Sequence, residues 1–117
     1  MVIVDTSVWI NHLRQGEPAL VKLLAGGKVL MHPFVRGELA CGNLKNRQAI
    51  LADLAALPPP PMASTDEVLA LIDRNKLHGR GLGWIDVHLL ASALLSHARL
   101  WTLDKSLSTV AAQLKLS

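Results

Sequence analysis

The chain opens with three β-branched residues, Val2–Val4, which stop at Asp5 and pass directly into a helix-forming stretch. A short run with no polar side chain is typical of a strand that is buried on both faces of a sheet. Thr6 or Ser7 can cap the following helix, which is expected to reach about Arg14. The start of the chain therefore predicts a buried strand that leads into a helix at an acidic residue.

Apolar strands continue to alternate with amphipathic helices along the sequence. Further strands are expected at 29–32, around Met62 and at 99–103, and helices at 18–25, 33–41, 46–57, 64–78, 84–97 and 105–114. Ser64 and Glu67 have the spacing of a capping box, and the proline run at 58–61 is expected to form a rigid turn. Strands joined by helices favour a parallel sheet with right-handed crossovers. We predict an α/β fold, a three-layer α/β/α sandwich around a short parallel sheet of four or five strands.

Length and composition favour one domain over residues 1–117. The chain has 117 residues, half of them hydrophobic, and charged or proline residues interrupt every apolar run before it reaches the ~18 residues that cross a bilayer. The first residues show no secretory signal, so a cytoplasmic protein is expected. The single Cys41 excludes an internal disulfide and a thiolate metal site.

Four acidic residues are expected to converge. Asp5 and Asp104 each follow a predicted strand, and the carboxyl ends of parallel strands meet at one edge of a sheet. Asp86 begins the apolar stripe of the helix predicted at 84–97. Glu38 shares a helix face with Phe34, a position that surface acids usually avoid. The pattern predicts a carboxylate cluster.

Each of these acids also has an ordinary structural role available. Asp5 and Asp104 could cap helices, Asp86 could interact with a helix dipole, and Glu38 could be a solvated surface group. Four such coincidences among only nine acidic residues are less plausible than one cluster. Carboxylates held close together need a shared proton or a cation, and oxygen ligands without thiolates favour Mg²⁺ or Mn²⁺. We therefore predict a metal site.

The remaining charges favour an anionic partner. Outside the predicted cluster the chain has five acidic residues and 12 basic residues, and the pI of the whole chain is near 9.4. An acidic centre in a basic surround suits metal-assisted hydrolysis of a phosphodiester. The residues expected to hold flanking phosphates are Arg80, Lys105 and Arg14, with Lys45 and Arg47 as further candidates. Only four aromatic residues and no tyrosine are present, which argues against a base-stacking platform.

The histidines and tryptophans suggest no further site. No pair of histidines has the spacing of a zinc protease, so all five are interpreted as structural or surface groups. Trp9 and Trp101 are expected in the core or in a subunit contact.

The acidic residues lie in an ordered set of motifs that resembles the PIN-domain nucleases, and among them the toxins of VapBC-type toxin–antitoxin pairs. The motifs are VDTSVWI at 4–10, RGEL at 36–39, GWIDVHLLA at 83–91 and TLD at 102–104, and together they extend over almost the whole chain. Many relatives carry a further acid and an aromatic after the last motif, where this chain has Ser106 and Leu107.

The resemblance implies a metal-dependent endoribonuclease that uses Mg²⁺ or Mn²⁺. It implies that the catalytic and metal-binding acids are Asp5, Glu38, Asp86 and Asp104, supported by Thr6, Ser7 and Thr102. It also implies a homodimer that is inhibited by a VapB-type antitoxin. The alternative is a PIN-like module that has lost catalysis and only binds RNA or protein.

Overall fold

Three parallel strands form the sheet in the computed structural model, which describes residues 1–117. They are β1 (Val2–Val4), β2 (Val29–Leu30) and β3 (Arg99–Trp101), in the order β2-β1-β3. Val2 of β1 pairs with Val29 on one side and with Arg99 on the other. The first strand of the chain is therefore the central strand, which explains why it has no polar residue.

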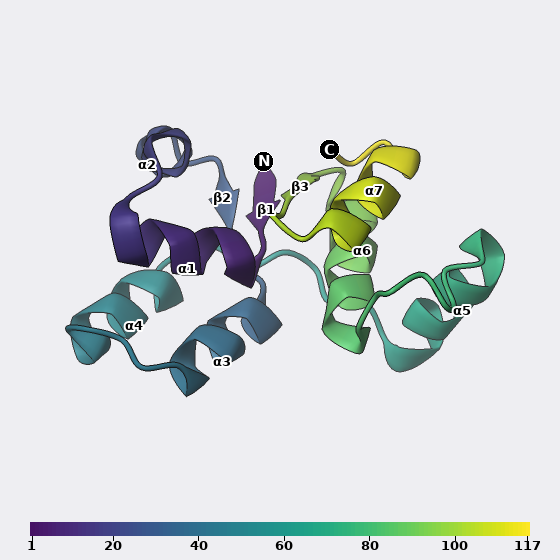
Figure 1. Cartoon of the computed structure of the whole chain (residues 1–117), viewed down its shortest axis with the longest axis horizontal. Coiled ribbons are helices and arrows are strands. Elements are labelled where there is room, and N and C mark those ends of the chain that lie inside the picture. The colour runs from purple at the N-terminus through teal and green to yellow at the C-terminus, as the bar shows by residue number, and fades with distance from the viewer.

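Seven helices surround this sheet. They are α1 (Thr6–Gln15), α2 (Pro18–Ala25), α3 (Pro33–Cys41), α4 (Arg47–Ala55), α5 (Thr65–Asn75), α6 (Trp84–Ser96) and α7 (Lys105–Gln113). Figure 1 shows α1 to α4 on one side of the strands and α5 to α7 on the other. α6 packs against β1 and β3, α5 packs against α6, and α3 lies between α1 and α4. This arrangement confirms the predicted α/β class with a parallel sheet between helices.

The core consists of 27 buried apolar residues in one cluster. Ile3 in β1 and Leu89 and Leu90 in α6 are completely buried. Because removing one such side chain from water contributes about 1.5–3 kcal/mol, the contact between α6 and the central strand is a main source of stability. The same contact fixes the amino-terminal end of α6 relative to the end of β1.

The sheet is smaller than predicted, with three strands instead of four or five. No strand forms around Met62, because residues 58–63 have no regular secondary structure, and their one backbone hydrogen bond runs from the Met31 N–H to the Pro58 carbonyl at 2.8 Å. Prolines have no N–H with which to continue a ladder. At the other edge, the Leu100 N–H donates to the Leu116 carbonyl at 2.7 Å, so the end of the chain contacts β3 without forming a fifth strand.

The predicted helices are confirmed, with small differences at their ends. Ser64 and Glu67 form the expected capping box, with hydrogen bonds of 3.1 Å and 2.8 Å between each side chain and the other's N–H. α5 ends at Asn75 rather than near position 78, because Lys76 takes the left-handed conformation with φ of 53°. None of the helices has the length and apolar character needed to cross a membrane.

Candidate functional site

Asp5 lies at the carboxyl end of β1 and is 8% exposed. Its Oδ2 accepts hydrogen bonds of 2.8 Å from both Ser7 Oγ and Thr102 Oγ1. Although Asp5 has the N-cap position of α1, its side chain makes no capping hydrogen bond. The capping interpretation is therefore wrong for this residue, and two hydroxyls hold the carboxylate instead.

These hydroxyls also connect two segments that are far apart in the sequence. Ser7 Oγ accepts a 3.0 Å hydrogen bond from the Leu103 N–H, and Thr102 Oγ1 accepts one of 3.0 Å from the Asp104 N–H. The turn after β3 is thereby fixed to the turn after β1, as expected for neighbouring parallel strands. Both predicted supporting residues, Ser7 and Thr102, contact the acid that they were expected to support.

Asp104 has the structural role that was considered for it. Its Oδ2 caps α7 by accepting a 2.8 Å hydrogen bond from the Leu107 N–H, so the structural role is confirmed. Its Oδ1 makes no hydrogen bond within the protein. The cap fixes the orientation of the carboxylate and leaves one oxygen available.

Glu38 approaches the site from α3. Its Oε1 accepts a 2.7 Å hydrogen bond from Thr6 Oγ1, which belongs to the first turn of α1. The contact joins α1 to α3 and fixes the glutamate near the end of β1. The third predicted supporting residue, Thr6, therefore contacts an acid of the cluster as well.

Asp86 is the acid whose pKa is affected by the charges of the other three. Its Oδ2 accepts a 2.9 Å hydrogen bond from the Gly83 N–H in the first turn of α6. Partial burial is the main cause that raises the pKa of Asp86 above its usual value, and the charges of Asp5, Asp104 and Glu38 raise it further, while the Gly83 N–H opposes the shift. The other three acids are therefore each within electrostatic reach of Asp86.

The four carboxylates share one arrangement. In each, one oxygen accepts a hydrogen bond that fixes the side chain, and the other oxygen makes no hydrogen bond within the protein. No three of the acidic or histidine side chains surround a common point at ligand distance, and repulsion among four like charges favours this separation. The donor set, made only of carboxylate oxygens with hydroxyls behind them, fits Mg²⁺ or Mn²⁺.

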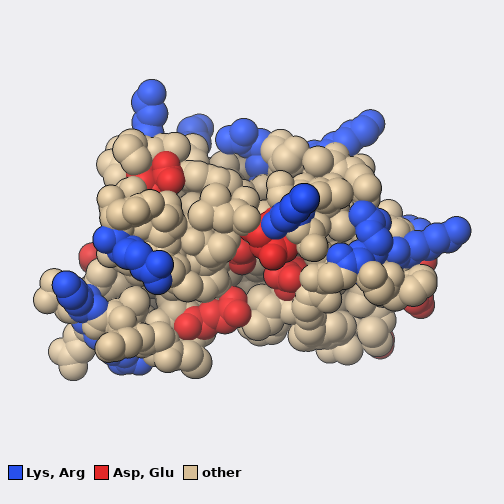
Figure 2. All heavy atoms as spheres, in the orientation of Figure 1, with Lys and Arg blue, Asp and Glu red and all other residues tan.

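Two of the predicted phosphate-holding residues, Lys105 and Arg80, belong to α7 or contact it. Figure 2 shows acidic side chains gathered in a hollow at the centre of one face, with lysines and arginines around it. Lys105 is exposed beside Asp104 at the start of α7. Arg80 is partly buried, and its Nη2 donates a 2.9 Å hydrogen bond to Gln113 Oε1, so α7 fixes its position.

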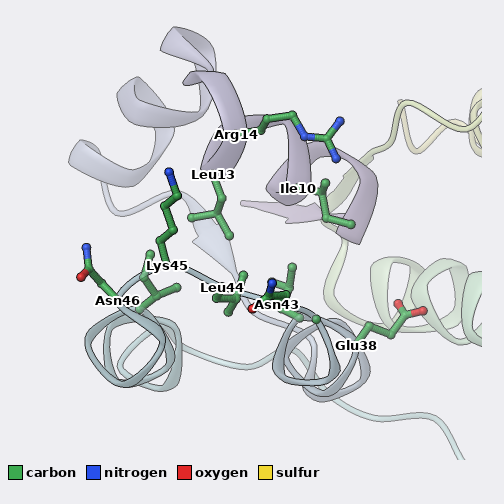
Figure 3. Close-up of a pocket in the computed structure, with 11 residues that line it drawn as sticks. Ile10, Leu13, Arg14, Glu38, Asn43, Leu44, Lys45 and Asn46 are labelled. Carbon is green, nitrogen blue, oxygen red and sulfur yellow. The ribbon is translucent and has the colours of Figure 1, made fainter.

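Arg14 belongs to a cleft of about 640 Å³ between α1 and the segment that joins α3 to α4. Figure 3 shows Arg14 and Lys45 on opposite walls, with Ile10 and Leu13 of α1 between them and Glu38 at one end. The last of the five candidates, Arg47, donates a 2.8 Å hydrogen bond to the Ala40 carbonyl and so also supports this wall.

The sequence analysis missed a cluster of aromatic rings beside the acids. His32 is completely buried, and burial followed by the charge of His88 lowers its pKa to about 4. His88 is also buried, with a lowered pKa, and packs edge to face against Phe34 and Trp84 at centroid distances of 4.8 and 4.9 Å. The sequence feature that could have indicated this cluster is the position of Trp84, two residues before Asp86 at the start of a predicted helix.

Comparisons with known proteins identify the family to which the chain belongs. The family model of the PIN domain matches residues 2–113. Ribonuclease VapC32 of Mycobacterium tuberculosis strain CDC 1551 / Oshkosh is 49% identical over 114 residues, which is 97% of this chain and 92% of the relative, and Ribonuclease VapC32 of strain ATCC 25618 / H37Rv matches equally. No solved structure gives a significant match. The chain is a homologue of the VapC proteins and belongs to the PIN-domain family.

Proposed function

We propose that this protein is the toxin of a toxin–antitoxin pair and acts as an endoribonuclease that needs Mg²⁺ or Mn²⁺. The observation that carries the proposal is that the charges of three acids act on Asp86, and each of the four carboxylates accepts a hydrogen bond at one oxygen and none at the other. Support also comes from the 49% identity to proteins named Ribonuclease VapC32. The proposal covers the whole chain, 1–117, as a single domain that works in the cytoplasm.

In this proposal, Asp5, Glu38, Asp86 and Asp104 hold the cation through their free oxygens. A cation bound there supplies charge stabilisation to the phosphate and lowers the pKa of an attacking water. The protein's own contribution is orientation, because Ser7 and Thr102 fix the buried Asp5 and Thr6 fixes Glu38. Burial, and in addition the charges of the other three acids, raise the pKa of Asp86, so a bound cation would stabilise its charged form.

The basic residues would hold the rest of the substrate. Lys105 is exposed beside Asp104, and Arg14 is exposed in the cleft that ends at Glu38. Arg80 is positioned by Gln113. Contacts of this kind read the RNA backbone and carry little sequence information.

We further propose that the protein forms a homodimer and binds a VapB-type antitoxin. Support comes from the VapC name of its relatives and from the cleft with apolar and basic walls that ends at Glu38. Light scattering of the protein alone, and co-purification with the product of the neighbouring gene, test the two parts separately. A monomer at micromolar concentration would contradict the first, and absence of a complex would contradict the second.

Cleavage of a circular RNA by the purified protein tests the activity. An endoribonuclease opens the circle, whereas an exonuclease finds no end. Linear product is expected with Mg²⁺ or Mn²⁺ and none with chelator. Intact circles in every condition, together with binding of the same RNA, would favour the inactive binding module instead.

A further inference from the structure

Trp84 is an exposed aromatic side chain at the border of the acidic cluster. It is the first residue of α6, it lies two residues before Asp86, and it remains 43% exposed. Of the chain's four aromatic residues, Trp9 is buried and Trp101 and Phe34 are partly buried. Trp84 is therefore the aromatic ring that is most available to a ligand, and it lies beside the proposed site.

The ring of Trp84 is held in place rather than free to rotate. It packs edge to face on the buried His88, with centroids 4.9 Å apart and planes at 79°. His88 packs in turn on Phe34 of α3, with centroids 4.8 Å apart and planes at 73°. A ring supported on its inner side and open on its outer side is suited to stacking on another flat group.

The ring contacts also relate Trp84 to the acids. Phe34 and Glu38 are four residues apart on one face of α3, so they are separated by one helical turn, about 5.4 Å. Trp84 reaches this face through His88, which lies one helical turn further along α6. Asp86 projects from the opposite side of the first turn of α6, because residues two apart on a helix do not share a face. The aromatic rings thus border the carboxylates on the α3 side, where Glu38 lies.

The exposed apolar side chains favour contact through bases. In the proposed function the phosphates contact the cation and the basic residues, whereas the faces of unpaired nucleobases are uncharged and stack on tryptophan in single-stranded RNA. Leu103 adds a second exposed apolar side chain, between Thr102 and Asp104. Binding through the backbone alone, which the scarcity of aromatic residues suggested, would leave both side chains without a role.

We propose that Trp84 stacks on an unpaired nucleobase next to the RNA bond that is cut. This inference rests on the proposed ribonuclease function and adds a requirement to it, because a base inside a duplex cannot reach the ring. Trp84 is then a substrate-binding residue that selects unpaired over paired RNA beside the cleavage point.

Fluorescence titration of the Asp5→Asn protein in Mg²⁺ tests this without any cleavage. The probes are an unstructured RNA oligonucleotide of mixed sequence and an abasic oligonucleotide of equal length and charge. The base-bearing probe is expected to quench tryptophan emission and to bind about 10-fold more tightly than the abasic probe. Trp84→Ala, added to this protein, should remove the quenching and the 10-fold difference, and Trp84→Phe should retain most of the difference because it keeps a ring.

Leu69→Ala provides the matched control, since Leu69 is 47% exposed on α5, outside the acidic cluster. It should leave both affinities unchanged. Equal binding of the two probes by the Asp5→Asn protein, which needs no change at Trp84, would overturn the inference. So would a Trp84→Ala variant that binds both probes normally but loses dimerisation.

The outcomes separate the two proposals. If the wild type cleaves RNA but the probes bind equally, only the role of Trp84 is wrong. If the wild type cleaves nothing but the base-dependent quenching appears, the role of Trp84 remains and the ribonuclease proposal fails. If the wild type cleaves nothing and neither probe binds, both proposals fail.

Discussion

At the scale of single residues, the acids show why a structural role and a proposed functional role need not exclude each other. Asp104 caps α7 through one oxygen and has the other free, while Asp5 has a cap position but makes no cap. The sequence predicted that these acids converge, because strand ends and helix stripes are readable from periodicity. It could not predict which oxygen each hydrogen bond would occupy, because that depends on side-chain rotamers.

Asp86→Asn tests whether like charges strain the cluster. Asparagine retains an oxygen that can accept the Gly83 N–H but removes the charge on which Asp5, Asp104 and Glu38 act. With chelator, the melting temperature should stay unchanged or rise, because repulsion is relieved. Added Mn²⁺ should stabilise the wild type by about 1.4 kcal/mol at ten times the dissociation constant, and the variant by less.

Thermal melts across a metal titration provide this comparison, with Glu38→Gln as a second variant. If Asp86 were only a helix-dipole partner, its loss would cost about 0.3–1 kcal/mol whether or not metal is present. Variants that melt lower in chelator and respond to metal like the wild type would contradict the cluster.

At the scale of elements, the loop between α5 and α6 positions two parts of the site. It carries Arg80 and ends at Gly83, whose N–H orients Asp86. Gly81 has φ of +79°, and a Cβ at this position would lie 3.0 Å from Ser106 Oγ of α7. The loop is therefore held tightly against α7 by a residue without a side chain.

Gly81→Ala should destabilise the protein by about 1–3 kcal/mol, because alanine is strained at positive φ and contacts Ser106. Gly37→Ala in α3 is the opposite case, since its added Cβ meets nothing within 4 Å. That change should stabilise by about 0.5–1 kcal/mol through helix propensity. Urea unfolding measures both, and equal effects of the two substitutions would contradict this account of the loop.

Element boundaries were predicted less well than element types. The helices followed from apolar periodicity and from Ser64, Pro18 and Pro33 at their starts, and the structure confirms them. The expected strand around Met62 does not form, because the prolines at 58–61 have no N–H groups that could donate to a neighbouring strand. The contact of the loop at 79–83 with α7 depends on tertiary packing that periodicity does not encode.

At the scale of the whole molecule, buried histidines make stability depend on pH. His32 caps α3 by accepting a 3.0 Å hydrogen bond from the Phe34 N–H, and its pKa falls from 6.5 to about 4 through burial and the charge of His88. Below pH 6.5 the unfolded chain binds a proton that folded His32 does not bind. Stability is therefore complete above pH 6.5 and decreases as the pH falls toward 4.

His32→Asn should reduce this dependence, because asparagine still accepts the Phe34 N–H but does not titrate in this range. The expected change between pH 7 and pH 4 is at most about 3 kcal/mol for His32. Urea unfolding at several pH values measures it, with the exposed His78→Asn as control. An unchanged pH profile in His32→Asn would show that His32 does not cause the effect.

The central claim is that the turns after β1 and β3 and the helices α3 and α6 together form one four-carboxylate metal site. Titration of the protein with Mn²⁺, followed by the electron paramagnetic resonance of the free ion, tests it most directly. We expect each of Asp5→Asn, Glu38→Gln, Asp86→Asn and Asp104→Asn to weaken binding at least about 10-fold. Asp53→Asn, which removes an exposed acid of α4, should bind like the wild type. Equal Mn²⁺ affinity in the wild type and all four site variants would contradict the claim.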